Sequence, residues 1–379
     1  MNTHVQVLVP DRSRITGEPL LIVAVAVIVG IGIASLHGAT RPTDGGVSGD
    51  LLRQIAFLVV GAATLIGTSR FDYRVLRSAQ TLFYLGGIAA LLLVLVVGAH
   101  EFGARRWFVV GSYSLQPSEF ARLATVITVA ALASRRESRP RSFLLVSLLF
   151  AVPTLLILVE PDLGSSLVLV AAWLAMMVAW PVPLRVLSGL GAAMLAFVPL
   201  AFALAVPAYQ RERLAVFLDP DRDPLGSGFT LRQVEVALGN GGLAGRGLDA
   251  ASSALEGMAT RNSDFVLAQI GEQLGLAGTL VIVLAFAVIA WRGLSIADAA
   301  PNRFGQLLAV GITTLLVVPG MLHIAVNVRL FPATGIPLPF ASLGGSAIVA
   351  ASAGVGLLLS IASRQPPNPK ERWTGARWE

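Results

Sequence analysis

The chain has 379 residues, of which 55% are hydrophobic and only 13% are charged. Soluble domains carry about 25% charged residues, so the composition excludes an ordinary soluble globular protein. The chain has no cysteine, which excludes disulfides, thiol catalysis and iron–sulfur ligation. The net charge of +6 comes from arginines spread over many short segments, a pattern typical of a membrane topology signal and not of nucleic-acid binding.

Apolar runs of membrane length recur along the chain, and most are near the ~20 residues that cross about 30 Å of hydrocarbon. The first run, from Leu20 to Leu36, is too long for the apolar region of a typical signal peptide, so we interpret it as a membrane helix. The expected fold class is an all-α integral membrane protein with about ten transmembrane helices. The predicted spans are residues 19–37, 53–68, 80–98, 117–134, 142–159, 163–180, 185–206, 264–290, 304–327 and 341–362.

Lysine and arginine are concentrated in alternate connections between these spans. The positive-inside rule therefore predicts that both termini are cytoplasmic and that a large loop, residues 207–263 between the seventh and eighth spans, is extracytoplasmic. The expected domain organisation is a cytoplasmic tail over 1–18, a polytopic membrane domain over 19–362 and a cytoplasmic tail over 363–379. The last tail is polar and proline-rich and is expected to be disordered.

A compact polar cluster, GARRWF…LQPSEFARLA, leads into the fourth predicted span from the outer side. Arg105 and Arg106 stand before Trp107, an aromatic at the expected depth of the membrane interface, where a simple anchoring role is common. Glu119 and Arg122 are three residues apart and share one helix face. The pair is either a structural ion pair that closes the helix end, or part of a cationic pocket for phosphate in which Glu119 holds an arginine in place.

Two further polar clusters stand at the outer ends of spans. In EPDLGSS, Asp162 is positioned to cap the N-terminus of the sixth predicted helix. The segment LPFASLGGSA, residues 338–347, is a proline- and glycine-rich entry into the last span, and such backbone can line a cavity only where protein covers it. The histidines show no metal-ligand spacing, so we predict no structural zinc.

The loop over 207–263 is the only long polar stretch between apolar runs, and Asp264 follows it. Its GNGGLAGRG segment does not follow a strand of a βαβ unit, so a hinge or turn is favoured over a phosphate-binding loop. Asn262 or Ser263 can cap the eighth helix, which would place Asp264 in its first turn. There the helix dipole favours the carboxylate, whereas an apolar setting would raise its pKa. The residues alone leave open whether Asp264 is a general base or a ligand for a cation or hydroxyl.

Five motifs follow one another along the chain: GARRWF…LQPSEFARLA, EPDLGSSLVL, FLDPDRDPLGSGF…GNGGLAGRGL, SDFVLAQIGEQLGLAG and PATGIPLPFASLGGSA. Together they resemble the SEDS family, which includes RodA and FtsW, over residues from about 50 to 362. The resemblance implies a peptidoglycan glycosyltransferase that polymerises lipid II at the outer face of the bacterial cytoplasmic membrane, for cell-wall elongation or division. The partners it implies are lipid II, membrane lipids and a class B penicillin-binding protein that supplies the transpeptidase.

The resemblance also implies roles for individual residues. The essential aspartate of the family stands in a Thr/Ser-Asp-Phe motif, so Asp264 is the expected catalytic carboxylate. It would activate the 4-hydroxyl of an acceptor sugar, and undecaprenyl pyrophosphate would leave. No cofactor is assigned, and a divalent cation stays an open possibility. The expected substrate-binding residues are Arg105, Arg106, Trp107, Glu119, Arg122, Arg246 and Arg261.

The chain departs from the family pattern at several places. Ser263 stands where threonine is usual, Gln273 removes a charge, and Leu343 and Ala347 lose an aromatic ring and a hydroxyl. The motif FLDPDRDPLGSGF favours the elongation-type RodA, and a sporulation-type relative is the alternative within the family. Two alternatives belong to other functional classes: a lipid II flippase, and a non-enzymatic scaffold that recruits a penicillin-binding protein. The outer-edge position of Asp264 argues against transport.

Overall fold

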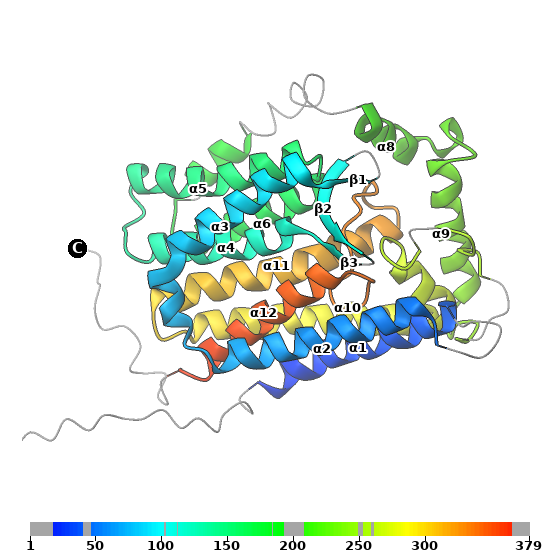
Figure 1. The fold of residues 1–379 in the computed structure, drawn as a ribbon, viewed down its shortest axis with the longest axis horizontal. Coiled ribbons are helices and arrows are strands. Elements are labelled where there is room, and N and C mark those ends of the chain that lie inside the picture. Colours follow the sequence, from blue (N-terminus) through cyan, green and yellow to red (C-terminus); the bar gives the residue numbers. More distant parts are fainter. Residues whose placement is uncertain are drawn as a thin grey trace, which may run out of the picture.

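The computed structural model describes residues 18–40, 47–101, 104–111, 113–183, 185–192, 208–248, 253–258 and 261–365. The molecule is a bundle of long helices, with a small sheet and helices α8 and α9 toward one end (Figure 1). The long helices are α1 (Pro19–Thr40), α2 (Gly49–Arg70), α3 (Leu76–Val97), α4 (Pro117–Ala133), α5 (Pro140–Val159), α6 (Leu163–Ala179), α10 (Val266–Asp298), α11 (Arg303–Asn327) and α12 (Gly345–Ala362). The other elements are η2 (Tyr73–Val75), β1 (Ala99–Glu101), β2 (Ala104–Val110), β3 (Tyr113–Leu115), α8 (Ala208–Leu218), η3 (Pro220–Arg222) and α9 (Ser227–Gly241).

Every predicted span except the seventh overlaps one of these long helices. Most of the seventh, 185–206, lies outside the described residues, so the count of ten is not confirmed. Within the described part of the chain, seven helical segments are long and apolar enough to cross a membrane, and α6 is a shorter apolar helix. The protein is therefore a helical, multi-pass membrane protein.

Helix α11 lies at the centre of the bundle. Three consecutive residues, Leu307, Leu308 and Ala309, are all 0% exposed, so neighbouring helices cover α11 on every side there. On α3, by contrast, Leu82 and Val96 are 76% and 70% exposed. An apolar face this open in a bundle of such length is the face that lipid covers.

A small antiparallel sheet stands between α3 and α4, where the sequence predicted only a connection. Its strand order is β1-β2-β3, with Trp107 opposite Ala99 and Phe108 opposite Leu115. Gly111, with φ +61°, makes the turn between β2 and β3, a conformation that glycine adopts without strain. The expected helical class is confirmed. The sequence did not predict the sheet, because its longest strand has only seven residues and is much shorter than a membrane span.

Helix α10 is broken at Gly275, where φ is +68°. The glycine-rich segment after α9 fills this break and pairs with the backbone groups that the break leaves. Leu276 N donates to Gly242 O at 2.9 Å, and Arg246 N donates to Glu272 O at 2.9 Å. The segment is thus a turn built against a helix, as favoured above, because buried backbone groups need partners.

The start of α10 differs from the expectation. The helix begins at Val266 with Phe265 at the N-cap position and no side-chain cap, so the prediction that Asn262 or Ser263 caps it was wrong. Asp264 accordingly lies before the helix and not in its first turn. Asn327 at the end of α11 takes over the capping role, since its Oδ1 accepts from Ala268 N at 3.1 Å.

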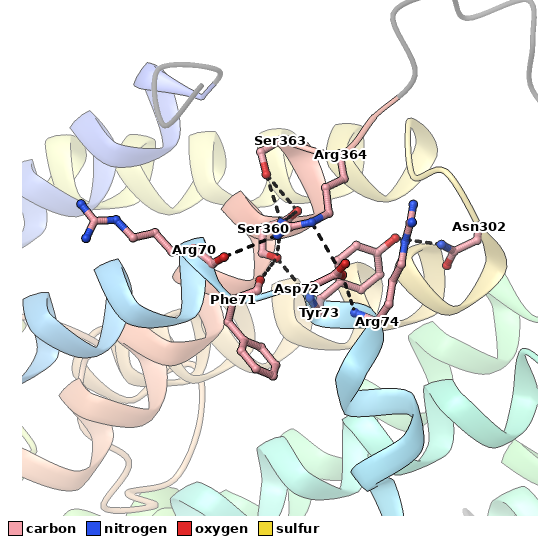
Figure 2. A network of polar contacts seen from close by, with 9 residues as sticks. All are labelled: Arg70, Phe71, Asp72, Tyr73, Arg74, Asn302, Ser360, Ser363 and Arg364. Carbon is pink, nitrogen blue, oxygen red and sulfur yellow. Dashed lines mark hydrogen bonds and ion pairs between the residues drawn. The ribbon is translucent and has the colours of Figure 1, made fainter. Parts of the chain in front are cut away.

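At the end of the bundle away from the sheet, a polar network ties three connections together (Figure 2). Ser360 Oγ donates to Phe71 O at 2.6 Å and accepts from Tyr73 N at 3.3 Å. The Tyr73 hydroxyl accepts from Asn302 Nδ2 at 2.9 Å, and Arg364 Nε lies 3.6 Å from an Asp72 carboxylate oxygen. The α2–α3 turn, the α10–α11 loop and the end of α12, all predicted to be cytoplasmic, therefore meet at one end.

The two ends of the described chain lie at this same end of the bundle. Glu18 accepts from Arg292 Nε at 2.7 Å, and Gln365 Nε2 donates to Ile296 O at 3.5 Å. Arg292 and Ile296 are one turn apart near the C-terminal end of α10. The chain thus enters and leaves the bundle on one side, as the charge pattern predicts for the two termini.

Candidate active site

A polar cavity of about 330 Å³ opens near the end of the bundle that carries the sheet. Side chains from β2, α4, α6, α8, the segment before α10 and the entry into α12 contribute to its wall. Segments far apart in sequence thus meet around one space. Its polar lining includes Arg106, Ser114, Gln116, Glu119, Asp162, Ser165, Arg213, Ser263, Asp264 and Ser346.

Hydrogen bonds to the backbone of residues 262–264 hold Asp264 at this cavity. Ser342 Oγ donates to Ser263 O at 2.7 Å, and Leu343 N donates to Asn262 O at 2.9 Å. Asn327 Nδ2 donates to Asp264 O at 3.3 Å. The proline- and glycine-rich entry into α12 therefore lines the cavity, as its composition predicted, and fixes the segment that carries the carboxylate.

The pKa of Asp264 is raised above its ordinary value. Burial is the largest cause, and it is opposed by a hydrogen bond from the Ser263 side chain and by the positive charges of Arg213 and Arg106. Desolvation, one of the two effects that the sequence left open, therefore prevails over the Ser263 hydrogen bond and the two positive charges. A carboxylate with a raised pKa is better suited to accept a proton than an ordinary surface aspartate.

Arg106 is fixed by the turn between α5 and α6. Its Nε donates to Glu160 O at 2.8 Å, and its Nη2 donates to Pro161 O. The guanidinium also stands 5.9 Å from the centre of the Trp107 ring, within the range of a cation–π contact. In the same turn Asp162 caps α6 as expected, with Oδ1 accepting from Ser165 N at 3.0 Å.

Glu119 and Arg122 form the expected ion pair on α4, and both side chains are buried. Pro117 occupies the first turn of this helix, where its missing N–H costs nothing. Glu119 lines the polar cavity and also a smaller apolar pocket of about 40 Å³, whereas Arg122 lines only the apolar pocket. The pair thus separates the polar space around Asp264 from an apolar space deeper among the helices.

Four of the five expected substrate-binding arginines do not line this cavity: Arg122, described above, and Arg105, Arg246 and Arg261. Arg105 is exposed, and its Nη1 donates to Val96 O at 3.0 Å. Arg246 lies 3.5 Å from the Glu272 carboxylate. Arg261 Nη2 donates to Ala39 O at 2.5 Å and lines a separate cavity of about 190 Å³. Of the expected residues, Arg106, Trp107, Glu119 and Asp264 share the polar cavity.

Arg213 is a residue of the cavity that the sequence did not single out. It lies on α8, its Nη1 donates to Ala333 O at 3.4 Å, and its charge lowers the pKa of Asp264. Its only signal in the sequence is a position in the basic segment QRER just after an apolar run. That segment holds Arg211 as well, and only the fold distinguishes the arginine at the cavity from the exposed one.

Within the described residues, no group of three histidine, aspartate or glutamate side chains is arranged to hold a metal ion. The chemistry that the described residues can supply is proton transfer at Asp264 and binding of an anion by Arg106 and Arg213.

Curated relatives of similar sequence cover most of the chain. It is 34% identical over 319 residues to a probable peptidoglycan glycosyltransferase FtsW of Trichlorobacter lovleyi, covering 83% of each chain. It is 33% identical over 316 residues to the peptidoglycan glycosyltransferase MrdB of Escherichia coli K12, covering 83% of this chain and 85% of the relative.

Solved structures and a family model indicate the same family as these relatives. Thermus thermophilus RodA superposes with a TM-score of 0.67 at 26% identity, covering 92% of this chain and 97% of RodA. A chain of a peptidoglycan synthase complex, studied for its coordination of polymerization and crosslinking, superposes with a TM-score of 0.77 at 30% identity, covering 90% of this chain and 96% of its own. Residues 18–366 match the family model FTSW_RODA_SPOVE, described as cell cycle protein. The resemblance to the SEDS family is confirmed, and the chain belongs to the FtsW, RodA and SpoVE family of cell cycle proteins.

Proposed function

We propose that this chain is a peptidoglycan glycosyltransferase that polymerises lipid II into glycan strands. The observation that carries the proposal is the pairing of a partly buried Asp264, whose pKa is raised, with Arg106 and Arg213 around one cavity of about 330 Å³. Such a site combines a proton acceptor with two cations that can bind a pyrophosphate. The names of the curated relatives support the same activity.

In the proposed reaction, Asp264 removes the proton from the 4-hydroxyl of the acceptor sugar. The hydroxyl oxygen attacks the anomeric carbon of the lipid-linked donor, a new C–O bond forms, and the bond to the pyrophosphate oxygen breaks. The electron pair of that bond leaves with undecaprenyl pyrophosphate, whose charge Arg106 and Arg213 stabilise. Retaining glycosidases use a second carboxylate about 5 Å from the first as the nucleophile. In the proposed reaction the hydroxyl attacks the anomeric carbon directly, which inverts its configuration.

The other residues of the site have supporting roles in this proposal. Trp107 lines the cavity beside Arg106 and offers an apolar face to a sugar ring. Glu119 and Arg122 mark the boundary with the apolar pocket, where the first carbons of a lipid chain would be sheltered from water. Roles in substrate binding for Arg105, Arg246 and Arg261 stay predictions, because none of the three lines the cavity.

The expected site of action is the outer face of the bacterial cytoplasmic membrane, with both termini in the cytoplasm. A multi-pass helical bundle and an excess of basic residues in the segments at the end opposite the cavity support this orientation. A class B penicillin-binding protein is the proposed partner. Similarity to a chain of a peptidoglycan synthase complex supports an assembly in which polymerisation and crosslinking are joined.

The direct test measures lipid II polymerisation by the purified protein with a class B partner, comparing the unsubstituted chain with Asp264→Asn. We expect glycan strands from the unsubstituted chain and a loss of at least about a hundredfold in Asp264→Asn, as for removal of a general base. Glu256→Gln, which neutralises an exposed carboxylate outside the cavity, is the matched control and should retain activity. Equal product from Asp264→Asn would remove Asp264 from the chemistry. Lipid II scrambling in vesicles without any polymerisation would favour a transporter instead.

A further inference from the structure

Glu160, in the turn between α5 and α6, is a buried carboxylate that the proposed reaction does not use. The residue is 0% exposed, and neither carboxylate oxygen has a hydrogen-bond partner among the described residues. Two other buried glutamates are different, because Glu119 is paired with Arg122 and Glu272 accepts from Ser253 Oγ at 2.6 Å. A buried carboxylate without hydrogen bonds is costly to ionise, so this environment favours its neutral form.

Glu160 is nevertheless next to the cation of the cavity. The Nε of Arg106 donates to the backbone carbonyl of Glu160 at 2.8 Å. The charged groups that act on the Glu160 carboxyl are Asp162 from its own turn and Arg106 from β2. Burial, followed by the negative charge of Asp162, raises the pKa of Glu160 to about 8, and the positive charge of Arg106 opposes this rise.

We propose that Glu160 is a positioning residue that stays protonated while the site is in use, so that the positive charge of Arg106 remains available to the pyrophosphate diester of a lipid-linked sugar. This inference rests on the proposed function. An ionised Glu160 would offset the charge of Arg106 and would add to the negative charge of Asp162 and of the ligand. When the carboxyl is neutral, the backbone carbonyl of Glu160 still accepts from Arg106 Nε, and the side chain adds no repulsion.

The sign of the resulting pH dependence follows. Below about pH 8 Glu160 is protonated and adds no negative charge beside Arg106 when the anion binds. As the pH rises through about 8, Glu160 loses its proton and the affinity for the anion falls. If the anion and the ionised Glu160 repel each other by the equivalent of one pKa unit, the affinity falls about tenfold.

The experiment measures binding, so that it does not depend on turnover. The protein carries Asp264→Asn throughout, because Asp264 also faces Arg106 and its own titration would mix with that of Glu160. The probe is a dialkyl pyrophosphate diester, which keeps one negative charge on each phosphate from about pH 6.5 to about pH 9.5, as the diester of a lipid-linked sugar does. Its dissociation constant is measured across this range with and without Glu160→Gln, an uncharged side chain of the same shape.

We expect Asp264→Asn alone to lose about tenfold in affinity across pH 8, and the addition of Glu160→Gln to hold the low-pH affinity at every pH. Adding Glu256→Gln instead should leave the pH dependence intact, because that exposed carboxylate lies outside the cavity. If Glu160→Gln does not fold, Glu160→Met supplies another uncharged side chain of similar length. The infrared C=O band of a protonated carboxyl, present at neutral pH and lost on either substitution, is an independent readout.

Three results would overturn the inference: an affinity that does not change with pH, the same pH dependence with and without Glu160, or no probe bound at any pH. The last result would also remove the pyrophosphate from the cavity. Failure of the proposed function appears differently, as absence of polymerisation by the unsubstituted chain with its partner while the pH-dependent binding persists.

Discussion

Three influences compete for the proton of Asp264, and their balance depends on residues from separate parts of the chain. Burial favours the neutral acid, whereas the Ser263 hydrogen bond and the charges of Arg213 and Arg106 favour the carboxylate. The pKa ends above its ordinary value, so the carboxylate is a stronger base than that of an ordinary surface aspartate. This balance can be shifted by changing one arginine.

Arg213→Gln is expected to move the acid limb of the pH–rate profile to higher pH. Arg213 lowers the raised pKa of Asp264, so its removal raises that pKa further and the carboxylate is lost at a higher pH as the solution is acidified. We also expect about a tenfold loss in kcat/KM for lipid II, because one charged contact to the pyrophosphate is gone. Arg211→Gln, an exposed arginine on the same helix, is the matched control. An unchanged profile in Arg213→Gln would show that its charge does not reach Asp264.

Glu119→Gln is expected to destabilise the protein by about 3–5 kcal/mol, because it leaves the buried Arg122 without its counter-charge. The double substitution Glu119→Gln with Arg122→Gln should recover much of this loss, which thermal unfolding in detergent would measure. Polymerisation distinguishes the two interpretations of the pair. If the double variant regains activity together with stability, the pair is purely structural, and if it stays inactive, the pair also acts on the substrate.

The break in α10 shows how the loop over 207–263 is joined to the helical bundle. The regular hydrogen bonds of the helix are interrupted at Gly275. The glycine-rich turn after α9 replaces them, because Gly242 O accepts from Leu276 N and Arg246 N donates to Glu272 O. Glu272 stands just before the break, and its carboxylate accepts from Ser253 Oγ of the same loop at 2.6 Å. The loop is thereby attached to the helix that follows Asp264 in the chain.

Gly275→Ala should destabilise this junction by at least about 1–3 kcal/mol, the cost of a left-handed backbone in a residue with a side chain. The added Cβ would also stand 2.4 Å from Gly245 N, a backbone atom with little freedom to move. Gly239→Ala in α9 is the matched control, since a Cβ there meets nothing within 4 Å and alanine favours helix. Melting temperatures of the two variants in the same detergent would compare them, and equal values would contradict the packing described for the break.

For the whole molecule, the two ends of the bundle are chemically different. One end carries the network of Ser360, Tyr73 and Arg364, which links connections rich in arginine (Figure 2). The other carries the sheet and the cavity with Asp264. This polarity matches a protein that faces the cytoplasm with the first end and a lipid-linked substrate with the second.

The absence of cysteine makes this orientation directly testable with single cysteine substitutions. Leu225, which is 93% exposed before α9, is expected to react as Leu225→Cys with a membrane-impermeant maleimide in intact cells. Glu137, exposed in the α4–α5 connection, should react as Glu137→Cys only after the membrane is permeabilised. Labelling of both in intact cells, or of Glu137→Cys alone, would contradict the predicted topology.

The sequence by itself determined the helical membrane class, the approximate position of the described long helices, the family and the motif around Asp264. These properties are local. A run of apolar residues predicts a membrane helix from its own length and hydropathy, and a short motif can be identified without knowing its contacts in the fold. Pro117 at the start of α4 and the Asp162 cap of α6 belong to the same group, since their roles involve neighbours within one turn.

Only the tertiary structure decided which charged residues meet at the cavity. It brings Arg213 to Asp264 and leaves Arg246 beside Glu272, although both arginines belong to the same polar loop. It also replaces the expected local cap of α10 by Asn327 from another helix. The physical reason is that burial, desolvation and long-range hydrogen bonds depend on what surrounds a group in space, and hydropathy along the chain carries no record of that environment.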